Sequence, residues 1–449
     1  MTKSRIPLDS CARLLGARFK AWALFSCACA IGLLTSPCIL LGQTTRASSD
    51  VDVRAAQGTE HAGGTFAVGG ERGYGFESND GANLFYTHWL AATDFQTFLG
   101  MKPPGLGSRD TFVVRLAAVQ LDAVLHRIVH SQILVDFSQS KLTLYDAWVQ
   151  IRIADWLSLR LGKFQFPINE ERLTPLISLP FVNTGFASFL LPNRDTGVQV
   201  LGEVADGKVT YNLTLVNGAY AGVMSETDVD SNKDVIGRIF VRPFRETKLA
   251  ALRKLGFGLG GSYGSHIGTA DTSALPVLRT YGGQTFFAYR TTTRANGEIA
   301  RVVPHATWGW GPFAAYSDYV RTIERVSSTL VTSDGWSIVP SVVLTGEDAS
   351  PLTFIIPKHP LDLSSGHIGT VLVLGGAGEI QVSSTAFHSA ADPATAMQRA
   401  KAFGAGVNWY PFSGIAILLQ GGHMVFDGFK GAPARPAESS FIGRFEMVL

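Results

Sequence analysis

Two pairs of arginines are the residues whose type and spacing most clearly suggest chemistry. Arg152 and Arg160 lie on either side of a short connection at 154–156, and Arg238 and Arg242 are four residues apart. In an extended strand, residues separated by an even number share one face, so each pair would present two guanidinium groups together. Guanidinium N–H groups can replace part of the hydration of an anion. These arginines are therefore candidates for weak, transient binding of small anions.

The pattern around Arg152 and Arg160 predicts an antiparallel hairpin. Apolar residues alternate with polar ones at Val149, Ile151, Ile153, Leu157, Leu159 and Leu161. A three-residue loop at 154–156, with Ile153 paired to Leu157, sets Arg152 opposite Ser158 and Gln150 opposite Arg160. Two neighbouring cations on a dry face would repel each other. The polar face is therefore expected to line a water-filled interior.

The same period of two continues through the chain. From residue 66 onward, segments of alternating apolar and polar residues are separated by clusters of Gly, Asn, Asp and Pro. The connections at 154–156 and 205–208 are short, whereas those at 166–196 and 218–234 are long. Short turns on one rim and long loops on the other are typical of a transmembrane antiparallel β-barrel. The length predicts an all-β protein with about 16 strands.

Composition supports a chain that exposes apolar surface. Of the 449 residues, 46% are apolar and only 16% are charged, whereas soluble domains carry about 25% charge. Beyond residue 42 no uninterrupted apolar run reaches the roughly 18 residues that a membrane-spanning helix needs. These features exclude a disordered polymer, a helical membrane bundle and a basic nucleic-acid binder.

The N-terminus has the layout of a secretory signal. Five basic residues precede an apolar stretch from Ala21 to about Leu41, which predicts a signal peptide at 1–42. A short segment at 43–64, whose order the sequence leaves open, and a barrel at 65–449 would follow. All four cysteines lie within 1–42, so an exported chain has none. Loss of this segment removes five Lys or Arg and one Asp, and changes the formal net charge from +2 to −2.

Several short motifs, in their order, resemble the phosphate-selective porin O and P family of bacterial outer-membrane proteins. They are DAWVQ at 146–150, LGKFQFP at 161–167, PNRDTGVQ at 192–199, GPFAAYSDY at 311–319, LTGE at 344–347, GEI at 378–380 and VNWY at 407–410. The final residues, 441–449, are similar to the closing strand of such barrels. Asp318 stands where the family usually has Glu, and Leu449 where a terminal Phe is usual.

The resemblance implies a 16-stranded barrel, usually a homotrimer in the outer membrane, that passes anions such as phosphate. The long connection at 166–196 would fold into the lumen and narrow it. By motif position Lys163, Arg172 and Arg194 would lie at or near this constriction, with Arg152 and Arg160 on the lumen wall below and Arg238 with Arg242 as a further pair. The alternative for each is a rim charge that pairs with a nearby carboxylate. The function expected is passive diffusion of small hydrophilic solutes with a modest preference for anions.

Two other classes of protein remain open at this point. One is an exported, soluble, lectin-like β-sandwich, in which the apolar face of each strand would meet a second sheet. The other is a barrel with a plugged lumen that acts as an adhesin or enzyme. No compact cluster of nucleophile, base or metal ligands supports catalysis, so we expect neither enzymatic activity nor a cofactor.

Three motifs carry little weight. Gly256–Gly261 matches G-x-G-x-x-G, but strand-like residues follow it instead of the helix that binds a dinucleotide. Asp228–Asp234 has the alternating acidic spacing of a calcium loop without its Gly at the sixth place or Glu at the twelfth. His126 and His130 fall on a turn and a strand, about 13 Å apart if extended, too far to share a metal.

Overall fold

The computed structural model describes residues 65–68, 73–99, 110–138, 142–222, 228, 230–432 and 434–449. The signal peptide expected at 1–42 and the segment at 43–64 lie outside the described residues. Among the described residues, no helix is both long and apolar enough to cross a membrane.

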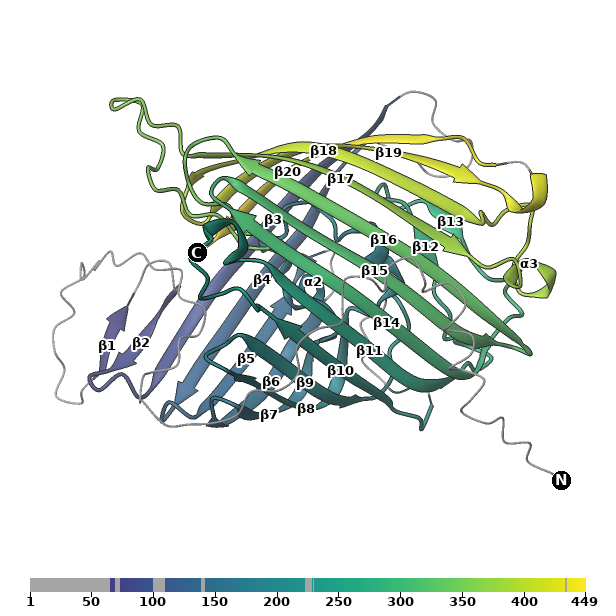
Figure 1. The fold of residues 1–449 in the computed structure, drawn as a ribbon, viewed down its shortest axis with the longest axis horizontal. Coiled ribbons are helices and arrows are strands. Elements are labelled where there is room, and N and C mark those ends of the chain that lie inside the picture. Colours follow the sequence, from purple (N-terminus) through teal and green to yellow (C-terminus); the bar gives the residue numbers. More distant parts are fainter. Residues whose placement is uncertain are drawn as a thin grey trace. The chain divides into compact units, whose positions relative to one another are not determined.

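Sixteen antiparallel strands form a closed barrel (Figure 1). They are β3 (Leu84–Leu99), β4 (Thr111–Leu125), β5 (Val129–Asp136), β6 (Thr143–Ala154), β7 (Leu157–Gln165), β8 (Arg194–Val204), β9 (Val209–Val216), β10 (Asp234–Val241), β11 (Gly256–Ile267), β14 (Ala295–Trp310), β15 (Phe313–Val326), β16 (Thr329–Val343), β17 (Thr370–Val382), β18 (Arg399–Phe412), β19 (Ile415–Asp427) and β20 (Glu438–Val448). Each pairs with the next along the chain, and β20 pairs with β3 to close the wall. The predicted fold class is confirmed.

A small hairpin extends one edge of β3. Strands β1 (Thr65–Val68) and β2 (Tyr74–Ser78) pair with each other, and Tyr74–Glu77 of β2 pairs with Leu84–Thr87 of β3. The last pair between β20 and β3 joins Val448 to Leu90. The hairpin therefore continues along β3 beyond the point where β20 ends.

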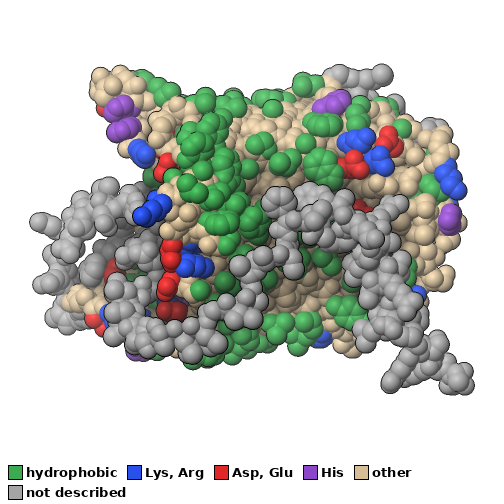
Figure 2. Space-filling view, in the orientation of Figure 1, with side chains coloured by type: hydrophobic (Ala, Val, Ile, Leu, Met, Phe, Trp, Pro, Cys, Tyr) green, Lys and Arg blue, Asp and Glu red, His purple; other side chains and the backbone are tan. Residues whose placement is uncertain are grey.

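The alternation of side chains along the strands sets an apolar outer face against a polar inner one. On β9, Leu213 and Leu215 are 58% and 49% exposed, whereas Asn212 and Thr214 between them are 7% and 1% exposed. Figure 2 shows hydrophobic side chains spread over the outer face of the barrel. Because these residues are exposed and not packed under a second sheet, the lectin-like sandwich is excluded.

The hairpin around Arg152 and Arg160 has almost the predicted register. Arg152 pairs with Ser158 and Gln150 with Arg160, as the alternation requires. The turn is one residue shorter than expected, because Ala154 pairs with Leu157 and Ile153 falls in a bulge. The bulge absorbs the odd residue without moving either arginine to the other face.

The two rims follow the predicted difference in loop length with three exceptions. The short-turn rim joins β4 to β5, β6 to β7, β8 to β9, β14 to β15 and β18 to β19, and the long-loop rim carries most other connections. However, 242–255 and 344–369 are long connections on the short-turn rim, and 327–328 is a short one on the long-loop rim. Segment 344–369 is held at its base by Glu347, which accepts hydrogen bonds from Thr345 and Thr370 at 2.6 and 2.7 Å. The prediction that length alone separates the rims was therefore too simple.

Two connections of the long-loop rim fold into the barrel. Residues 166–193, here called the inner loop, contain α2 (Glu170–Leu173), η4 (Leu176–Ser178) and η5 (Phe186–Leu190). The connection at 268–294 carries a short hairpin of β12 (Leu278–Arg279) and β13 (Thr285–Phe287). The remaining short helices are η6 (Ala250–Leu252), α3 (Ala386–Ser389) and η7 (Phe429–Gly431).

Candidate pore lining and constriction

The inner loop reaches across the lumen and docks on the wall at glycines. A side chain at Gly260 would place its Cβ 1.9 Å from the carbonyl oxygen of Ile168, so the missing side chain allows the loop to touch β11. The ring of Phe181 lies against Gly376 of β17 and Gly404 of β18 in the same way. The glycines of the 256–261 motif thus serve close packing and not nucleotide binding.

Amide side chains of the wall hold the middle of the inner loop. The carbonyl oxygen of Pro180 accepts hydrogen bonds from Nδ2 of Asn408 and Nε2 of Gln420, both at 2.8 Å. Oε1 of Gln420 accepts from the backbone N–H of Val182 at 2.9 Å. These bonds satisfy loop backbone groups that would otherwise be buried without partners.

A buried carboxylate on β15 anchors both ends of the inner loop. Asp318 is 4% exposed and accepts hydrogen bonds from Asn169 at 3.1 Å and Ser188 at 3.4 Å, which lie near the two ends of the loop. Wall residues Ser337 and Tyr316 also donate to it, at 2.5 and 3.3 Å. Asp318 therefore fixes the inner loop to the wall of the barrel.

A second buried carboxylate lies within the loop itself. Oε1 of Glu171 accepts a hydrogen bond from the N–H of Gly185 at 2.6 Å, while its Oε2 has no partner among the described residues. Burial, together with the nearby charge of Asp318, raises the pKa of Glu171 to about 7. Arg172 braces the loop by donating to the carbonyl oxygens of Ser188 and Leu191.

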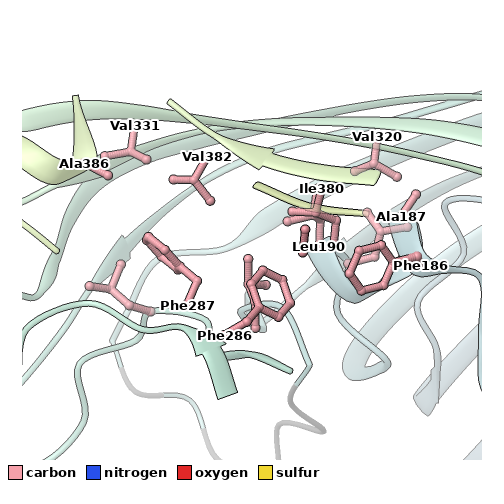
Figure 3. Close-up of a cluster of buried hydrophobic side chains, with 14 of the residues drawn as sticks. Phe186, Ala187, Leu190, Phe286, Phe287, Val320, Val331, Ile380, Val382 and Ala386 are labelled. Carbon is pink, nitrogen blue, oxygen red and sulfur yellow. The ribbon is translucent and has the colours of Figure 1, made fainter. Parts of the chain in front are cut away.

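Apolar side chains fill the lumen beside strands β15–β17. Phe186 packs against Phe286 and Tyr281, with ring centroids 5.9 and 5.6 Å apart, and wall residues such as Val320 and Ile380 enclose them (Figure 3). Val320 and Ile380 are both fully buried. The expectation of a water-filled interior is therefore wrong for this side, because two inward loops cover the wall with a hydrophobic core.

The inner face of β3–β7 is polar instead. Asp122 accepts hydrogen bonds from Gln120 at 2.7 Å and from Gln132 at 3.1 Å, and it lies 3.2 Å from His88. Gln132 in turn accepts from the indole N–H of Trp148 at 3.1 Å. His88 and Asp122 keep 19% and 28% of their side-chain surface exposed, so this wall is the accessible side of the lumen.

Arg160 presents a cation on this polar wall. Its Nε and Nη2 donate to Oε1 of Gln150 at 3.0 and 2.7 Å, and its guanidinium lies over the ring of Trp148, 4.2 Å from the centroid. Among the described residues it forms no ion pair with a carboxylate. On the neighbouring strands His130 pairs with Gln150 and Gln199 with Arg160. Both His130 Nε2 and Gln199 Oε1 are buried, with no hydrogen-bond partner in the described part of the chain.

Three other predicted arginines are neutralised by nearby carboxylates. Arg152 pairs with Asp155 at the short-turn rim, and Arg238 pairs with Glu170 of the inner loop. Nε and Nη2 of Arg194 both donate to Asp146 at 3.0 Å, and its guanidinium lies 4.7 Å from the centroid of the Tyr145 ring. Arg152 is thus a rim charge paired with a nearby carboxylate, as the alternative expectation has it. Arg194 and Arg238 instead stabilise the structure through their ion pairs.

The remaining predicted cations have different surroundings. Lys163 is 6% exposed and pairs with Ala147 and Thr196 in the strand ladder. It is three residues from Arg160, an odd number, which sets it on the opposite face of β7. Arg242 follows the end of β10 and lies 6.0 Å from the centroid of the Phe240 ring, without an ion pair among the described residues. The structure therefore does not gather the seven predicted residues into one site.

The sequence pointed toward some of this arrangement without identifying it. Asp146, Trp148 and Gln150 all belong to the DAWVQ motif, and Arg194 belongs to PNRDTGVQ, so two separate motifs meet in one ion pair. Glu171 and Asp318 were not expected to act together, because they lie on different elements and no spacing rule connects them.

The acidic loop does not assemble the oxygens that a calcium ion needs. Asp228 bonds Lys233, Asp230 accepts from the N–H of Ile267 at 2.6 Å, and Asp234 bonds Arg301 and His266. No group of three or more possible metal ligands occurs among the residues that the structure describes.

Comparison with known proteins gives the fold a context. No family model and no curated protein matches the chain. Solved structures do match: OmpT of Vibrio cholerae, folded in vitro, has a TM-score of 0.52 at 9% identity over 82% of this chain and 98% of that chain. The anion-selective porin from Comamonas acidovorans gives 0.50 at 9% identity over 82% and 100% of the two chains. The outer membrane channel DcaP of Acinetobacter baumannii gives 0.50 at 9% identity over 83% and 99%. At these identities the likeness establishes a porin-type barrel fold.

Proposed function

We propose that this chain is an outer-membrane porin of the phosphate-selective type, a homotrimer that lets small hydrophilic solutes diffuse passively with a modest preference for anions. It would be exported through its signal peptide and would act as neither an enzyme nor a cofactor-binding protein. The exposed apolar outer face of the barrel supports contact with membrane lipid. Neighbours described as an anion-selective porin and as an outer membrane channel support a channel function.

The observation that supports the anion preference is the positive charge of Arg160, which no nearby carboxylate among the described residues neutralises. Its positive charge is held in place by a neutral amide and an indole ring, which orient the guanidinium without cancelling it. An anion passing along β3–β7 would find directed N–H donors, but no second fixed charge that would trap it. Arg152 lacks this property, because Asp155 already neutralises it.

Replacing Arg160 with alanine should therefore reduce anion preference. One unit charge in water at about 4 Å contributes about 1 kcal/mol, which corresponds to a roughly fivefold change in the anion-to-cation permeability ratio. The measurement is the reversal potential in planar bilayers under a salt gradient. Arg152→Ala is the matched control and should change the ratio much less. Equal effects of the two variants would remove Arg160 from the filter.

The passage of phosphate through the pore can be tested with the same protein. If phosphate uses the path past Arg160, adding it should reduce the chloride current in the wild type and have a weaker effect in Arg160→Ala. A chloride current that phosphate does not alter would leave general anion preference intact and contradict the phosphate-selective assignment.

A second candidate, a plugged barrel, rests only on the hydrophobic filling of part of the lumen, and the similar solved structures do not favour it. The packing of Phe186 against Phe286 and Tyr281 obstructs the side next to β15–β17. Single-channel recording separates the two functions, because a plugged barrel would insert into lipid and resist detergent but carry no unitary current.

A further inference from the structure

A group of charged side chains lies on the outer surface of the barrel toward one of its ends. Figure 2 shows basic and acidic side chains side by side toward the right-hand end of the barrel, next to hydrophobic surface. Strands β15–β19 carry charged residues on the half of each strand nearer to the long-loop rim. We define the charged arc as Arg321, Asp334, Glu379, Arg399, Lys401 and Asp427.

Strand register places most of the charged arc in a single row. Arg321 pairs with Asp334, Asp334 with Gln381, Gln381 with Arg399, and Arg399 with Asp427, across five consecutive strands. The residues next to them along the strands, including Val320, Ile380 and Ala400, are fully buried on the inner side. The row therefore points outward, away from the lumen and from any solute path.

The two ends of the row are held differently. Nε of Arg321 lies 2.7 Å from Oδ1 of Asp334, a close ion pair. Nη2 of Arg399 donates to Oε1 of Gln381 at 3.2 Å, its contacts with Glu379 and Asp427 are longer, at 3.5 and 3.8 Å, and 36% of its side chain is exposed. Lys401 faces Glu379 across the ladder but forms no ion pair among the described residues. Lys401, and those of the five guanidinium N–H groups of Arg399 that these contacts do not use, can therefore bind an external partner.

The arc lies at the outer edge of the apolar band. Lys401 is eight residues from Trp409 on β18, and Arg321 is eight residues from Phe313 on β15. With a rise of about 3.3 Å and a tilt near 45°, eight residues correspond to roughly 20 Å along the barrel axis. The apolar band of such barrels is about 25 Å tall and bordered by aromatic residues. Tyr319 and Trp336, which pair with each other, lie one step inside the row.

The two signs of charge suggest the partner. Short turns face the periplasm in barrels of this kind, so the arc on the opposite side would meet the headgroups of the outer leaflet. Fixed charges in hydrocarbon cost a few kcal/mol each, whereas at headgroup level they can pair with charged lipid. A leaflet of phosphorylated glycolipid carries both phosphates and the divalent cations that bridge them. A mixed row of Arg, Lys, Asp and Glu matches both components.

We propose that the charged arc binds the phosphorylated sugar headgroup of an outer-leaflet glycolipid. Arg399 and Lys401 contact the phosphates, while Glu379 and Asp427 take a bridging divalent cation or the sugar hydroxyls. This inference rests on the outer-membrane location in the proposed function, but not on conduction. A barrel that carries no current could still bind the glycolipid, so the two proposals fail independently.

The test compares headgroups on the purified, folded, full-length barrel in neutral detergent. Bisphosphorylated lipid A is added, with magnesium, and binding is measured by native mass spectrometry and by the temperature at which the heat-modifiable gel band shifts. We expect lipid A to bind and to raise that temperature by several degrees. The same glycolipid with its phosphates removed should bind at least tenfold more weakly. Equal binding of the two glycolipids would overturn the proposal.

Variants locate the site. Arg399→Gln combined with Lys401→Gln should weaken lipid A binding about tenfold and leave conductance unchanged. The matched control is Lys208→Gln combined with Arg245→Gln at the short-turn rim, where Lys208 pairs with Glu246. An equal loss of binding in the control pair would contradict the assignment.

Because the exported chain lacks cysteine, Gln381→Cys tests the competing occupant, a second copy of this chain. Disulfide-linked dimers formed in the membrane would overturn lipid binding at the arc.

Discussion

Replacing Arg444 with alanine is expected to destabilise the barrel by about 3–5 kcal/mol, because it leaves two buried carboxylates without their cation. Arg444 of β20 donates to Asp94 of β3 at 2.6 and 2.9 Å and to Glu446 at 3.3 Å. Only 1% of the arginine side chain and 2% of the Glu446 side chain is exposed. These contacts join the last strand to the first, so their loss weakens the closure of the wall.

The shift of the heat-modifiable gel band with temperature measures this effect. Arg152→Ala, which removes an exposed rim arginine, is the control and should shift the transition little. A triple variant, Arg444→Met with Asp94→Leu and Glu446→Leu, should recover most of the stability, since it removes all the buried charge together. A triple variant as unstable as Arg444→Ala would show that arginine packing, and not uncompensated charge, is responsible.

The barrel could be predicted from the sequence because its cause is local. Each strand repeats the same alternation, so Leu213 and Leu215 point outward wherever the strand pairs. Alternation also restricts the register, which is why Arg152 opposite Ser158 and Gln150 opposite Arg160 could be foreseen. The bulge at Ile153 could not, because it lies between these pairs and the turn and leaves their register unchanged.

The contents of the lumen could not be predicted in the same way. Phe186 and Phe286 are 100 residues apart, and each lies in a connection with no regular period. Their contact depends on where both loops enter the barrel. The ion pairs are similar: nothing near Arg194 in the sequence distinguishes a free cation from one bound by Asp146. Strand alternation shows which face a charge occupies, but only tertiary structure shows whether it is already neutralised.

The docking of the inner loop is expected to weaken as pH rises through 7. Burial and the neighbouring Asp318 raise the pKa of Glu171 to about 7, above its ordinary value of 4.5. Protonated Glu171 therefore favours the docked loop. This stabilisation is complete below about pH 4.5 and is lost as the pH rises through 7. A pKa difference of this size corresponds to on the order of 3 kcal/mol, or roughly a few hundredfold in the docking equilibrium.

Hydrogen exchange of the amides in η5, corrected for the intrinsic effect of pH, should therefore be faster at pH 8 than at pH 5 by up to that factor. Glu171→Gln should abolish the difference, because the amide oxygen still accepts from Gly185 but carries no charge. Glu246→Gln, at an exposed ion pair with Lys208, is the control and should keep the wild-type profile. If Glu171→Gln retained the full pH dependence, the buried carboxylate pair would not be what holds the loop. A profile lost in Glu171→Gln alone would mean that the proton on Glu171 keeps the inner loop on the wall.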